Sequence, residues 1–248
     1  MLKVLFESVK IVGDLIINAP IVTVPNQLLP AVTKRLLGLY KGAYYVGGIS
    51  DSAEMRDCAS FAGHVYGDYS NNILPTGTTI LQRYHSQNDL RAVVYEYKDL
   101  IICAFAGSKT IKDWANNATQ LVGLSQQYEE ARDFAKEIVS QYGTSKVLFV
   151  GHSQGGGEAV YCACCYGANA VIFNPAALSF PTKIMGMTEY TQNAKITTVV
   201  FSSDVLDFVQ SLVKMPYTGE LWYVTDGNFI ENGIHGMKGI LKYFKILD

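Results

Sequence analysis

The chain has 248 residues, of which 49% are hydrophobic and 17% are charged, and its formal net charge is −2. This composition is typical of a globular protein and predicts one α/β domain with a well-filled core. Charges of both signs are balanced and form no basic run, so the composition argues against a nucleic-acid partner.

The five cysteines are an odd number, and Cys162, Cys164 and Cys165 crowd one predicted helix. No metal-ligand spacing with histidine accompanies them, so we interpret them as small buried core residues and expect no metal site. Reduced thiols favour a reducing compartment.

The N-terminal apolar run is interrupted by Glu7, Lys10 and Asp14, which is not the pattern of a secretory signal. No segment is apolar for long enough to span a bilayer. We therefore expect a cytoplasmic location, and export by a route that needs no signal stays open.

Residues 1–40 are interpreted as an N-terminal arm, followed by a catalytic domain at 41–248. Leu2–Ile17 is amphipathic with helical spacing, and prolines at 20, 25 and 30 then predict an extended connector. The helix either packs on a protein core or forms an arm for a membrane surface or an oligomer. Its balanced charges are weak support for an anionic membrane. The sequence does not predict the oligomeric state.

The first half of the catalytic domain mixes predicted strands and helices. Tyr40–Gly48 is rich in glycine and tyrosine and is expected to be a surface loop. A serine at 50 or 52 can cap a helix that runs to about Tyr66, and we interpret His64 within it as a packed residue rather than a base. Apolar and alternating patterns predict strands at 78–84, 92–97 and 100–106 and a helix at 126–142.

Strands and helices alternate through the second half. Short apolar strands are predicted at 147–150, 170–173, 196–201 and 222–224, with helices at 158–166 and 237–247. This alternation predicts an α/β fold with a mostly parallel central sheet and helices on both faces. In such a sheet, functional residues lie on loops after the carboxyl ends of strands.

The strongest motif is Gly151-His152-Ser153-Gln154-Gly155, a match to G-x-S-x-G between a predicted strand and a predicted helix. That context is typical of a nucleophile elbow, in which Ser153 lies on a strained turn. The flanking glycines allow close backbone packing, and the helix N-terminus faces any oxyanion formed beside the serine. The competing interpretation is a glycine-rich loop, such as a phosphate cradle.

A serine nucleophile needs a histidine base and a carboxylate that orients the base. In the α/β-hydrolase order of Ser, Asp and His, the base is His235, the only histidine after Ser153. His152 lies inside the elbow, where its side chain is expected to point away from the nucleophile.

The acid has three candidates, Asp204, Asp207 and Asp226. Asp204 is favoured because it is the first carboxylate after a buried strand. Asp207 is expected at the surface or at the start of a helix, and Asp226 follows the last strand, where the loop that carries the histidine should begin.

An oxyanion hole needs two donors, one of which is the N–H of the residue after the nucleophile, here Gln154. The second comes from a neighbouring strand-to-helix loop. Ser108 follows the buried strand 100–106 and could offer its N–H and its hydroxyl. It could also act as the N-cap of the next helix, and the two roles are compatible.

Two segments resemble the class 3 lipases, the fungal triacylglycerol lipase-like branch of the α/β-hydrolases. Gly151–Gly156 is similar to the GHSLGG motif of that family, with Gln154 in place of the usual leucine. Phe105–Trp114 is similar to its F-R-G-S/T-x-S-x-x-D/N-W stretch, with Ala106 in place of the usual arginine. Weaker similarity extends over about 51–235.

This resemblance implies a role for each candidate residue. The implied nucleophile, acid and base are Ser153, Asp204 and His235, and the implied oxyanion donors are Ser108 and the Gln154 N–H. Asn117 falls where the family often has an acid that orients the oxyanion serine, so this hydrogen bond would be neutral and weaker. The helix Ile111–Ala118 falls where fungal members carry an interfacial lid and is a second candidate for membrane contact.

The sequence thus predicts a serine carboxylester hydrolase that acts on a lipid or acyl-ester substrate through an acyl-enzyme. The lipid is a phospholipid, a lysophospholipid or an acylglycerol, and no metal or organic cofactor is expected. One alternative is an acyltransferase that uses the same triad. Another is a non-catalytic binding module with the hydrolase fold.

Overall fold

The computed structural model describes residues 44–45, 53–108, 126–176, 190, 193–201, 204, 206–207, 210, 219–224 and 235–248. Three predicted features lie outside the described residues: the N-terminal arm, the lid segment 111–118 with Asn117, and Asp226. The structure therefore bears on the catalytic domain, and the division at residue 40 stays a prediction.

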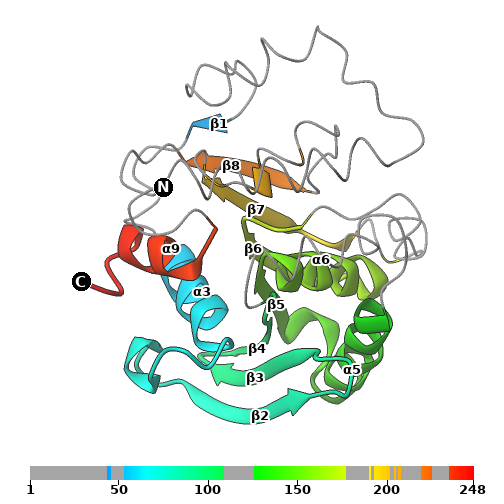
Figure 1. The fold of residues 1–248 in the computed structure, drawn as a ribbon. Helices are drawn as coiled ribbons and strands as arrows, with labels where there is room; N and C mark the ends of the chain where they lie inside the picture. Colours follow the sequence, from blue (N-terminus) through cyan, green and yellow to red (C-terminus); the bar gives the residue numbers. More distant parts are fainter. Residues whose placement is uncertain are drawn as a thin grey trace, which may run out of the picture.

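The described strands form one eight-stranded sheet in the order β1-β8-β7-β6-β5-β4-β3-β2 (Figure 1). Strands β4 to β8 and β1 form a parallel set, whereas β3 pairs antiparallel with β2 and with β4. The strands are β1 Tyr44–Tyr45, β2 Thr79–His85, β3 Arg91–Tyr97, β4 Leu100–Phe105, β5 Val147–His152, β6 Asn169–Phe173, β7 Ile196–Phe201 and β8 Glu220–Val224.

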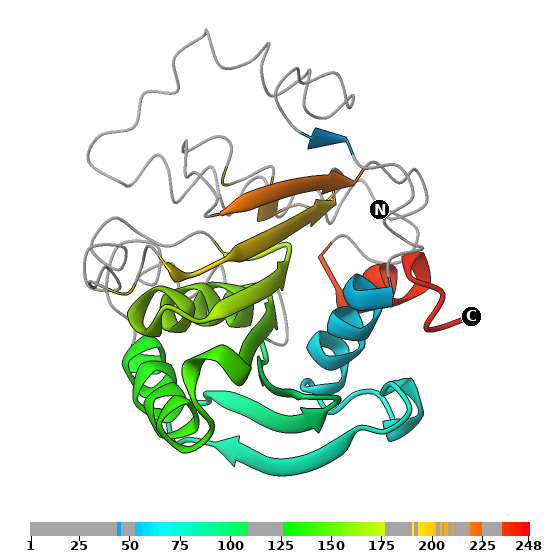
Figure 2. The same cartoon turned by 180° about the vertical axis from the view of Figure 1, so that it is seen from behind.

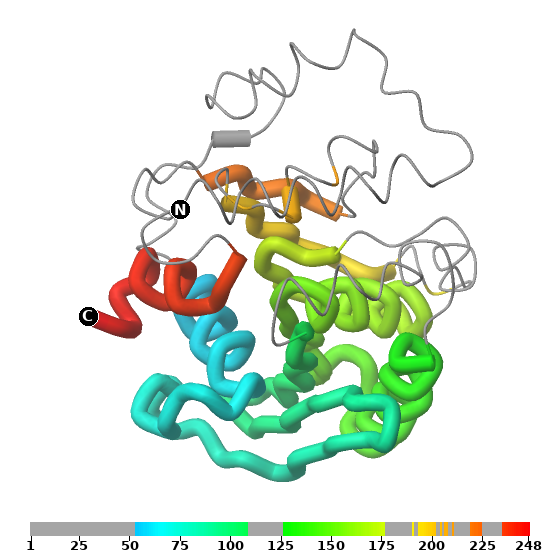
Figure 3. The backbone as a smooth tube through the Cα atoms, in the orientation of Figure 1, coloured from blue at the N-terminus to red at the C-terminus, as the bar shows by residue number. Residues whose placement is uncertain are grey.

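Helices cover both faces of this sheet. The helices α3 (Ala53–His64) and α9 (Met237–Tyr243) lie on one face, and α5 (Gln126–Tyr142) and α6 (Gln154–Tyr166) lie on the other (Figure 2). Two short 3₁₀ helices, η2 (Asn71–Ile73) and η4 (Thr144–Lys146), belong to the connections. The tube in Figure 3 shows that α3 and α9, which are far apart in the sequence, lie side by side.

Each face of the sheet has its own hydrophobic core, because alternate strand residues point to opposite faces. In β3, Val93 and Tyr95 pack toward α3 and α9, while Ala92 and Val94 pack toward α5 and α6. Strands β5 and β7 are buried along their whole length, which is the pattern expected of parallel strands covered on both faces. All five cysteines are buried thiols, as the sequence predicts.

The predicted elements agree with the structure in type, with three corrections to position or extent. Helix α9 ends at Tyr243 rather than at 247. Helix α6 begins at Gln154 rather than at 158, because the glycines of the elbow already belong to its first turn. The segment Tyr40–Gly48 is not wholly a loop, since Tyr44–Tyr45 pairs in parallel with β8, with Tyr44 opposite Trp222. Two residues are too few to show a strand pattern in the sequence.

None of the helices in the described ranges is both long and apolar enough to cross a membrane.

Candidate active site

Ser153 occupies a sharp turn between β5 and α6. Its backbone has a φ of 58° and a ψ of −129°, a conformation that is rare for a residue with a side chain and is typical of strained functional turns. A Cβ atom on Gly151 would overlap the backbone of Gly155, and one on Gly155 would overlap the carbonyl of Phe105. The glycines thus permit the close crossing of strand, turn and helix that holds the serine at the carboxyl end of β5.

Three side chains from three separate segments meet at this turn. His235 Nε2 lies 2.7 Å from Ser153 Oγ, and His235 Nδ1 lies 2.7 and 2.8 Å from the two carboxylate oxygens of Asp204. When the imidazole hydrogen is on Nδ1, that N–H donates a hydrogen bond to Asp204, and Nε2 is then the acceptor for the serine hydroxyl. The carboxylate has no exposed surface and the imidazole is only 7% exposed, so little water competes for these bonds.

The Asp204 carboxylate is fixed by further donors. Asn174 Nδ2 donates to Oδ2 at 2.7 Å, and the N–H groups of Leu206 and Asp207 donate to Oδ1 at 2.9 and 3.3 Å. Asn174 is itself held, because its Oδ1 accepts the Phe201 N–H at 2.8 Å. These bonds hold the Asp204 carboxylate in place and orient it toward His235.

Asp207 lies in helical conformation just after Asp204, one of the two positions that the sequence predicted for it. It is buried rather than at the surface, and its carboxylate accepts the Tyr223 hydroxyl at 2.7 Å. Asp204 is the candidate acid whose carboxylate contacts His235, while Asp226 lies outside the described residues.

The ring of His152 packs against the ring of His235 instead of reaching Ser153. The two rings lie 4.9 Å apart, and His152 Nδ1 lies 2.8 Å from the hydroxyl of Tyr66. Burial, with a further contribution from His235, lowers the pKa of His152 well below its usual value. A neutral His152 leaves His235 free to become positively charged without facing a second cation.

The loop Gly107–Ser108 lies against the serine on its other side. A Cβ atom on Gly107 would lie 2.9 Å from Ser153 Cβ, which shows how closely the loop approaches the nucleophile. The Gly107 N–H donates to the Tyr66 hydroxyl at 3.0 Å, and the Arg91 guanidinium donates to the Gly107 carbonyl at 2.8 Å. Both backbone groups of Gly107, the N–H and the carbonyl, are therefore hydrogen-bonded, and these two bonds fix the loop.

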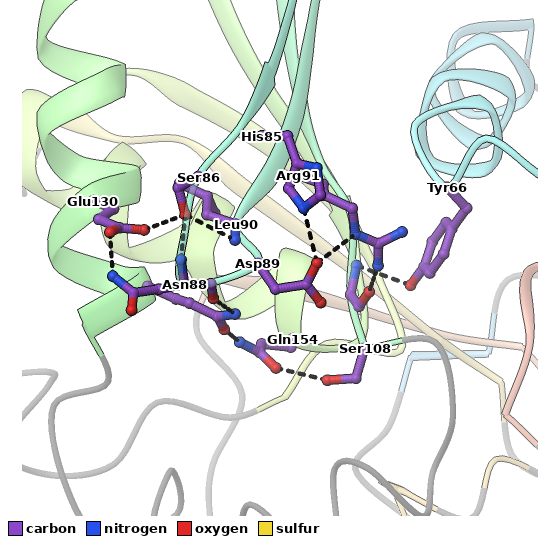
Figure 4. Close-up of polar contacts among 12 residues, drawn as sticks. Tyr66, His85, Ser86, Asn88, Asp89, Leu90, Arg91, Ser108, Glu130 and Gln154 are labelled. Atoms are coloured by element: carbon purple, nitrogen blue, oxygen red, sulfur yellow. Dashed lines mark hydrogen bonds and ion pairs between the residues drawn. The ribbon is translucent and has the colours of Figure 1, made fainter.

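Ser108 and Gln154, the two predicted oxyanion donors, are joined through their side chains. The Ser108 hydroxyl donates to Gln154 Oε1 at 2.8 Å (Figure 4). Gln154 Nε2 in turn donates to Gln127 Oε1 and, at 3.2 Å, to Glu158 Oε1. Asn117, which falls where the family often has an acid, lies outside the described residues. Within the described residues, the Ser108 hydroxyl contacts Gln154.

Glu158 is 1% exposed, and its second oxygen, Oε2, has no hydrogen-bond partner among the described residues. Burial raises its pKa well above the usual value, Gln154 and Arg91 oppose the rise, and Glu130 and Asp89 add to it. The protonated, neutral carboxyl is therefore favoured at this site.

Sequence reasoning missed the supporting residues of this site, chiefly Tyr66, Asn174, Gln127 and Glu158. None has a motif of its own, because each acts through a neighbour that only the fold brings near. The one available signal was Gln154, a polar residue where the family pattern has leucine. Within the described ranges, no cluster of three or more His, Cys, Asp or Glu side chains could hold a metal ion.

The sheet, the elbow and the Ser–His–Asp geometry define an α/β-hydrolase. A solved structure with the same fold, a triacylglycerol lipase from Penicillium expansum, matches with a TM-score of 0.51 at 16% identity. The match covers 70% of this chain and 79% of the fungal lipase. The resemblance seen in the sequence is thus confirmed for the fold.

Residues 57–242 match the family model described as the Tle-like phospholipase domain, so the chain belongs to this phospholipase-like family. A curated relative, the extracellular phospholipase A1 of Serratia liquefaciens, is 35% identical over 104 residues. That alignment covers 42% of this chain and only 30% of the Serratia protein.

Proposed function

We propose that this chain is a serine phospholipase that cleaves an acyl ester of phospholipids through an acyl-enzyme on Ser153. The observation that carries the proposal is the continuous hydrogen-bonded series Asp204–His235–Ser153, with contacts of 2.7 to 2.8 Å. Nucleophile and base are within reach of one another, and the base is oriented by a buried carboxylate, as nucleophilic catalysis requires.

In the acylation step, Ser153 Oγ attacks the carbonyl carbon of the ester while His235 Nε2 accepts the hydroxyl proton. The carbonyl oxygen becomes an oxyanion, which would accept hydrogen bonds from the Gln154 N–H and from Ser108. The C–O bond to the lysophospholipid then breaks, and His235 returns the proton to that leaving alcohol. Asp204 stabilises the imidazolium throughout.

In the deacylation step, a water molecule replaces the alcohol. His235 accepts a proton from the water as it attacks the acyl carbon. When the second tetrahedral intermediate collapses, the bond from the acyl carbon to Ser153 Oγ breaks, the fatty acid leaves, and His235 returns the proton to Ser153 Oγ. Each proton thus moves between His235 Nε2 and one of three partners: Ser153 Oγ, the leaving alcohol or the attacking water.

The choice of a phospholipid over an acylglycerol rests on the family description and on the name of the Serratia relative. The alignment covers less than a third of that relative, so the relative's name does not establish the substrate of this chain. The substrate therefore needs a direct test. Vesicles labelled at the sn-1 or the sn-2 acyl chain, lysophospholipid micelles and triacylglycerol emulsions distinguish the three lipid classes that the sequence leaves open.

The nucleophile is tested by labelling with a fluorophosphonate, followed by peptide mapping, in wild type, Ser153→Ala and His235→Ala. We expect the label on Ser153 in wild type only, and hydrolysis lowered by at least about 10⁴-fold in both variants. A folded wild type that takes no label and releases no fatty acid would contradict the hydrolase and favour the binding module. Acyl transfer to an added alcohol in preference to water would favour the acyltransferase.

We also propose that the chain acts outside the cytoplasm, in contrast to the expectation from the sequence. The support is the Serratia relative, whose name describes it as extracellular. Fractionation of cells that express the tagged chain tests this point, and retention of the active chain in the cytoplasm would contradict it. Contact with a membrane through 1–40 or 111–118 remains part of the proposal, to be measured as vesicle binding of chains that lack either segment.

A further inference from the structure

The side chain of Gln154 lies between the oxyanion serine and a polar network on α5 and the β2–β3 connection. Figure 4 shows it between Ser108 and the loop that bears Asn88. Gln127 Nε2 donates to the Asn88 carbonyl, and Gln127 Oε1 accepts from Gln154 Nε2. Gln154 Oε1 then accepts the hydroxyl of Ser108 at 2.8 Å.

The direction of this series is set by a backbone group. The Asn88 carbonyl can only accept, so Gln127 must turn its NH₂ group toward it and its oxygen toward Gln154. Gln154 must therefore present its own NH₂ to Gln127, and its oxygen faces Ser108. Glu158 Oε1 takes the second hydrogen of that NH₂ group at 3.2 Å.

The far end of the network is anchored as well. The Ser86 hydroxyl donates to Glu130 Oε2 at 2.5 Å, and Asn88 Nδ2 donates to the other oxygen of the same carboxylate. The Ser86 hydroxyl also accepts the Leu90 N–H at 3.2 Å. The loop is thereby attached to α5, the helix that also carries Gln127.

We propose that the Gln154 side chain, held by Gln127 and Glu158, is a positioning residue that sets the Ser108 hydroxyl as an oxyanion donor. This inference rests on the proposed function. It assigns a second role to Gln154, whose backbone N–H is the other proposed donor, and it gives Ser108 an orienting group within the described residues.

A neutral amide suits this position for two reasons. It carries no net charge that would repel an oxyanion, whereas a carboxylate would. It is also a weaker acceptor than a charged oxygen, so the Ser108 hydroxyl can turn its one hydrogen bond from Gln154 Oε1 to the oxyanion when the oxyanion forms, with no transfer of the proton. Rotation about the Cβ–Oγ bond suffices for this change, because the Oγ atom itself does not have to move.

A double-mutant cycle tests the coupling, with Ser108→Ala, Gln154→Met and the double variant compared in steady-state kinetics on phospholipid vesicles. Methionine matches the length of glutamine and its helix propensity. We expect Gln154→Met alone to lower kcat by about 10- to 100-fold, less than the about 10²- to 10³-fold cost of losing a donor outright, with KM changed by less than about threefold. In the Ser108→Ala background, the same change is expected to lower kcat by less than about threefold, because its effect passes through Ser108.

A second variant, Gln127→Ala, keeps the test valid if Gln154→Met fails to fold, because Gln127 lies farther from Ser153 in the network. Gln127→Ala is expected to lower kcat about three- to tenfold in the wild-type background and by less than about twofold in Ser108→Ala. The matched control is Gln126→Ala, an exposed neighbour on the same helix, which is expected to leave kcat unchanged.

The outcomes separate the two proposals. Equal losses in both backgrounds, or no loss in wild type, would overturn the positioning role while Ser153 still takes the fluorophosphonate label. A folded wild type without labelling and without hydrolysis would overturn the proposed function, and the positioning role with it.

Discussion

The two sides of Ser153 are built from different chemistry. On the base side, His235 faces the fully buried carboxylate of Asp204, and three N–H donors orient that carboxylate. On the oxyanion side, Ser108 meets an amide, and behind the amide lie a second amide and a buried carboxyl that favours its neutral form. In the proposed mechanism, the base side must accommodate a positive charge on the imidazole. The oxyanion side must accommodate a negative charge from the substrate, which an ionised acid beside it would repel.

The largest expected effect falls on the base side. Asp204→Asn should lower kcat by about 10⁴-fold, because the amide favours the wrong tautomer of His235 and cannot stabilise the imidazolium. The measurement is kcat on phospholipid vesicles. The matched variant Asp207→Asn changes a buried carboxylate three residues away, and we expect it to lower kcat by less than about tenfold. The reverse ranking would make Asp207 the acid.

Removal of the donor on the oxyanion side should cost less. Ser108→Ala should lower kcat by about 10²- to 10³-fold with little change in KM, because the interaction forms fully only with the oxyanion. If KM rises while kcat stays constant, Ser108 binds the ground state of the substrate instead. With that result, Ser108 would no longer count as a group that stabilises the oxyanion, and the contrast between the base side and the oxyanion side would not hold.

Tyr66 is the residue at which the two sides meet. Its hydroxyl accepts the Gly107 N–H of the oxyanion loop and contacts His152, which packs on His235. Tyr66→Phe should lower the free energy of unfolding by about 1–3 kcal/mol, because the Gly107 N–H loses its partner. Urea denaturation measures this loss, and Tyr69→Phe, on the same stretch of chain, is the control. Equal stability of wild type and Tyr66→Phe would show that water replaces the hydroxyl.

The neutral state of Glu158 predicts a pH dependence of stability. A carboxyl whose pKa is raised by folding keeps its proton in the native state after the unfolded chain has lost it. The free energy of unfolding therefore falls by about 1.4 kcal/mol per pH unit between two pH values. The lower one is the ordinary pKa of a glutamate, about 4.3, and the upper one is the raised pKa of Glu158 in the folded chain. Glu158→Gln removes this term, so its stability relative to wild type should grow with pH across that window. Urea denaturation at several pH values measures the difference, and a constant difference would show that Glu158 is ionised in the folded chain.

The sequence predicted the elements of this fold because its signals are local and strong. The run Leu100–Ala106 and the amphipathic pattern of 126–142 correspond to β4 and α5, the latter with the same bounds. The pairing of β1 with β8 escaped prediction, because a two-residue strand is defined by its partner and not by its own pattern.

For the site, the sequence predicted side chains that the structure brings into contact, namely Ser153, Asp204 and His235. It did so because the G-x-S-x-G turn and the order of the chain restrict the choice to a few residues. The supporting partners escaped prediction for a different reason. Asn174 and Gln127 reach the site across the sheet and from α5, and their contacts depend on register and helix packing, which no local pattern encodes.

The burial of the cysteines has a consequence for the environments in which this chain can exist. All five are thiols inside the protein, and burial raises the pKa of the described thiols Cys58, Cys103 and Cys162, with that of Cys165 raised to about 11. Because the thiolate is the species that exchanges and oxidises, little of any of these groups is reactive at neutral pH. These four thiols are therefore compatible with an oxidising environment as well as a reducing one, and this agrees with the proposed action outside the cytoplasm.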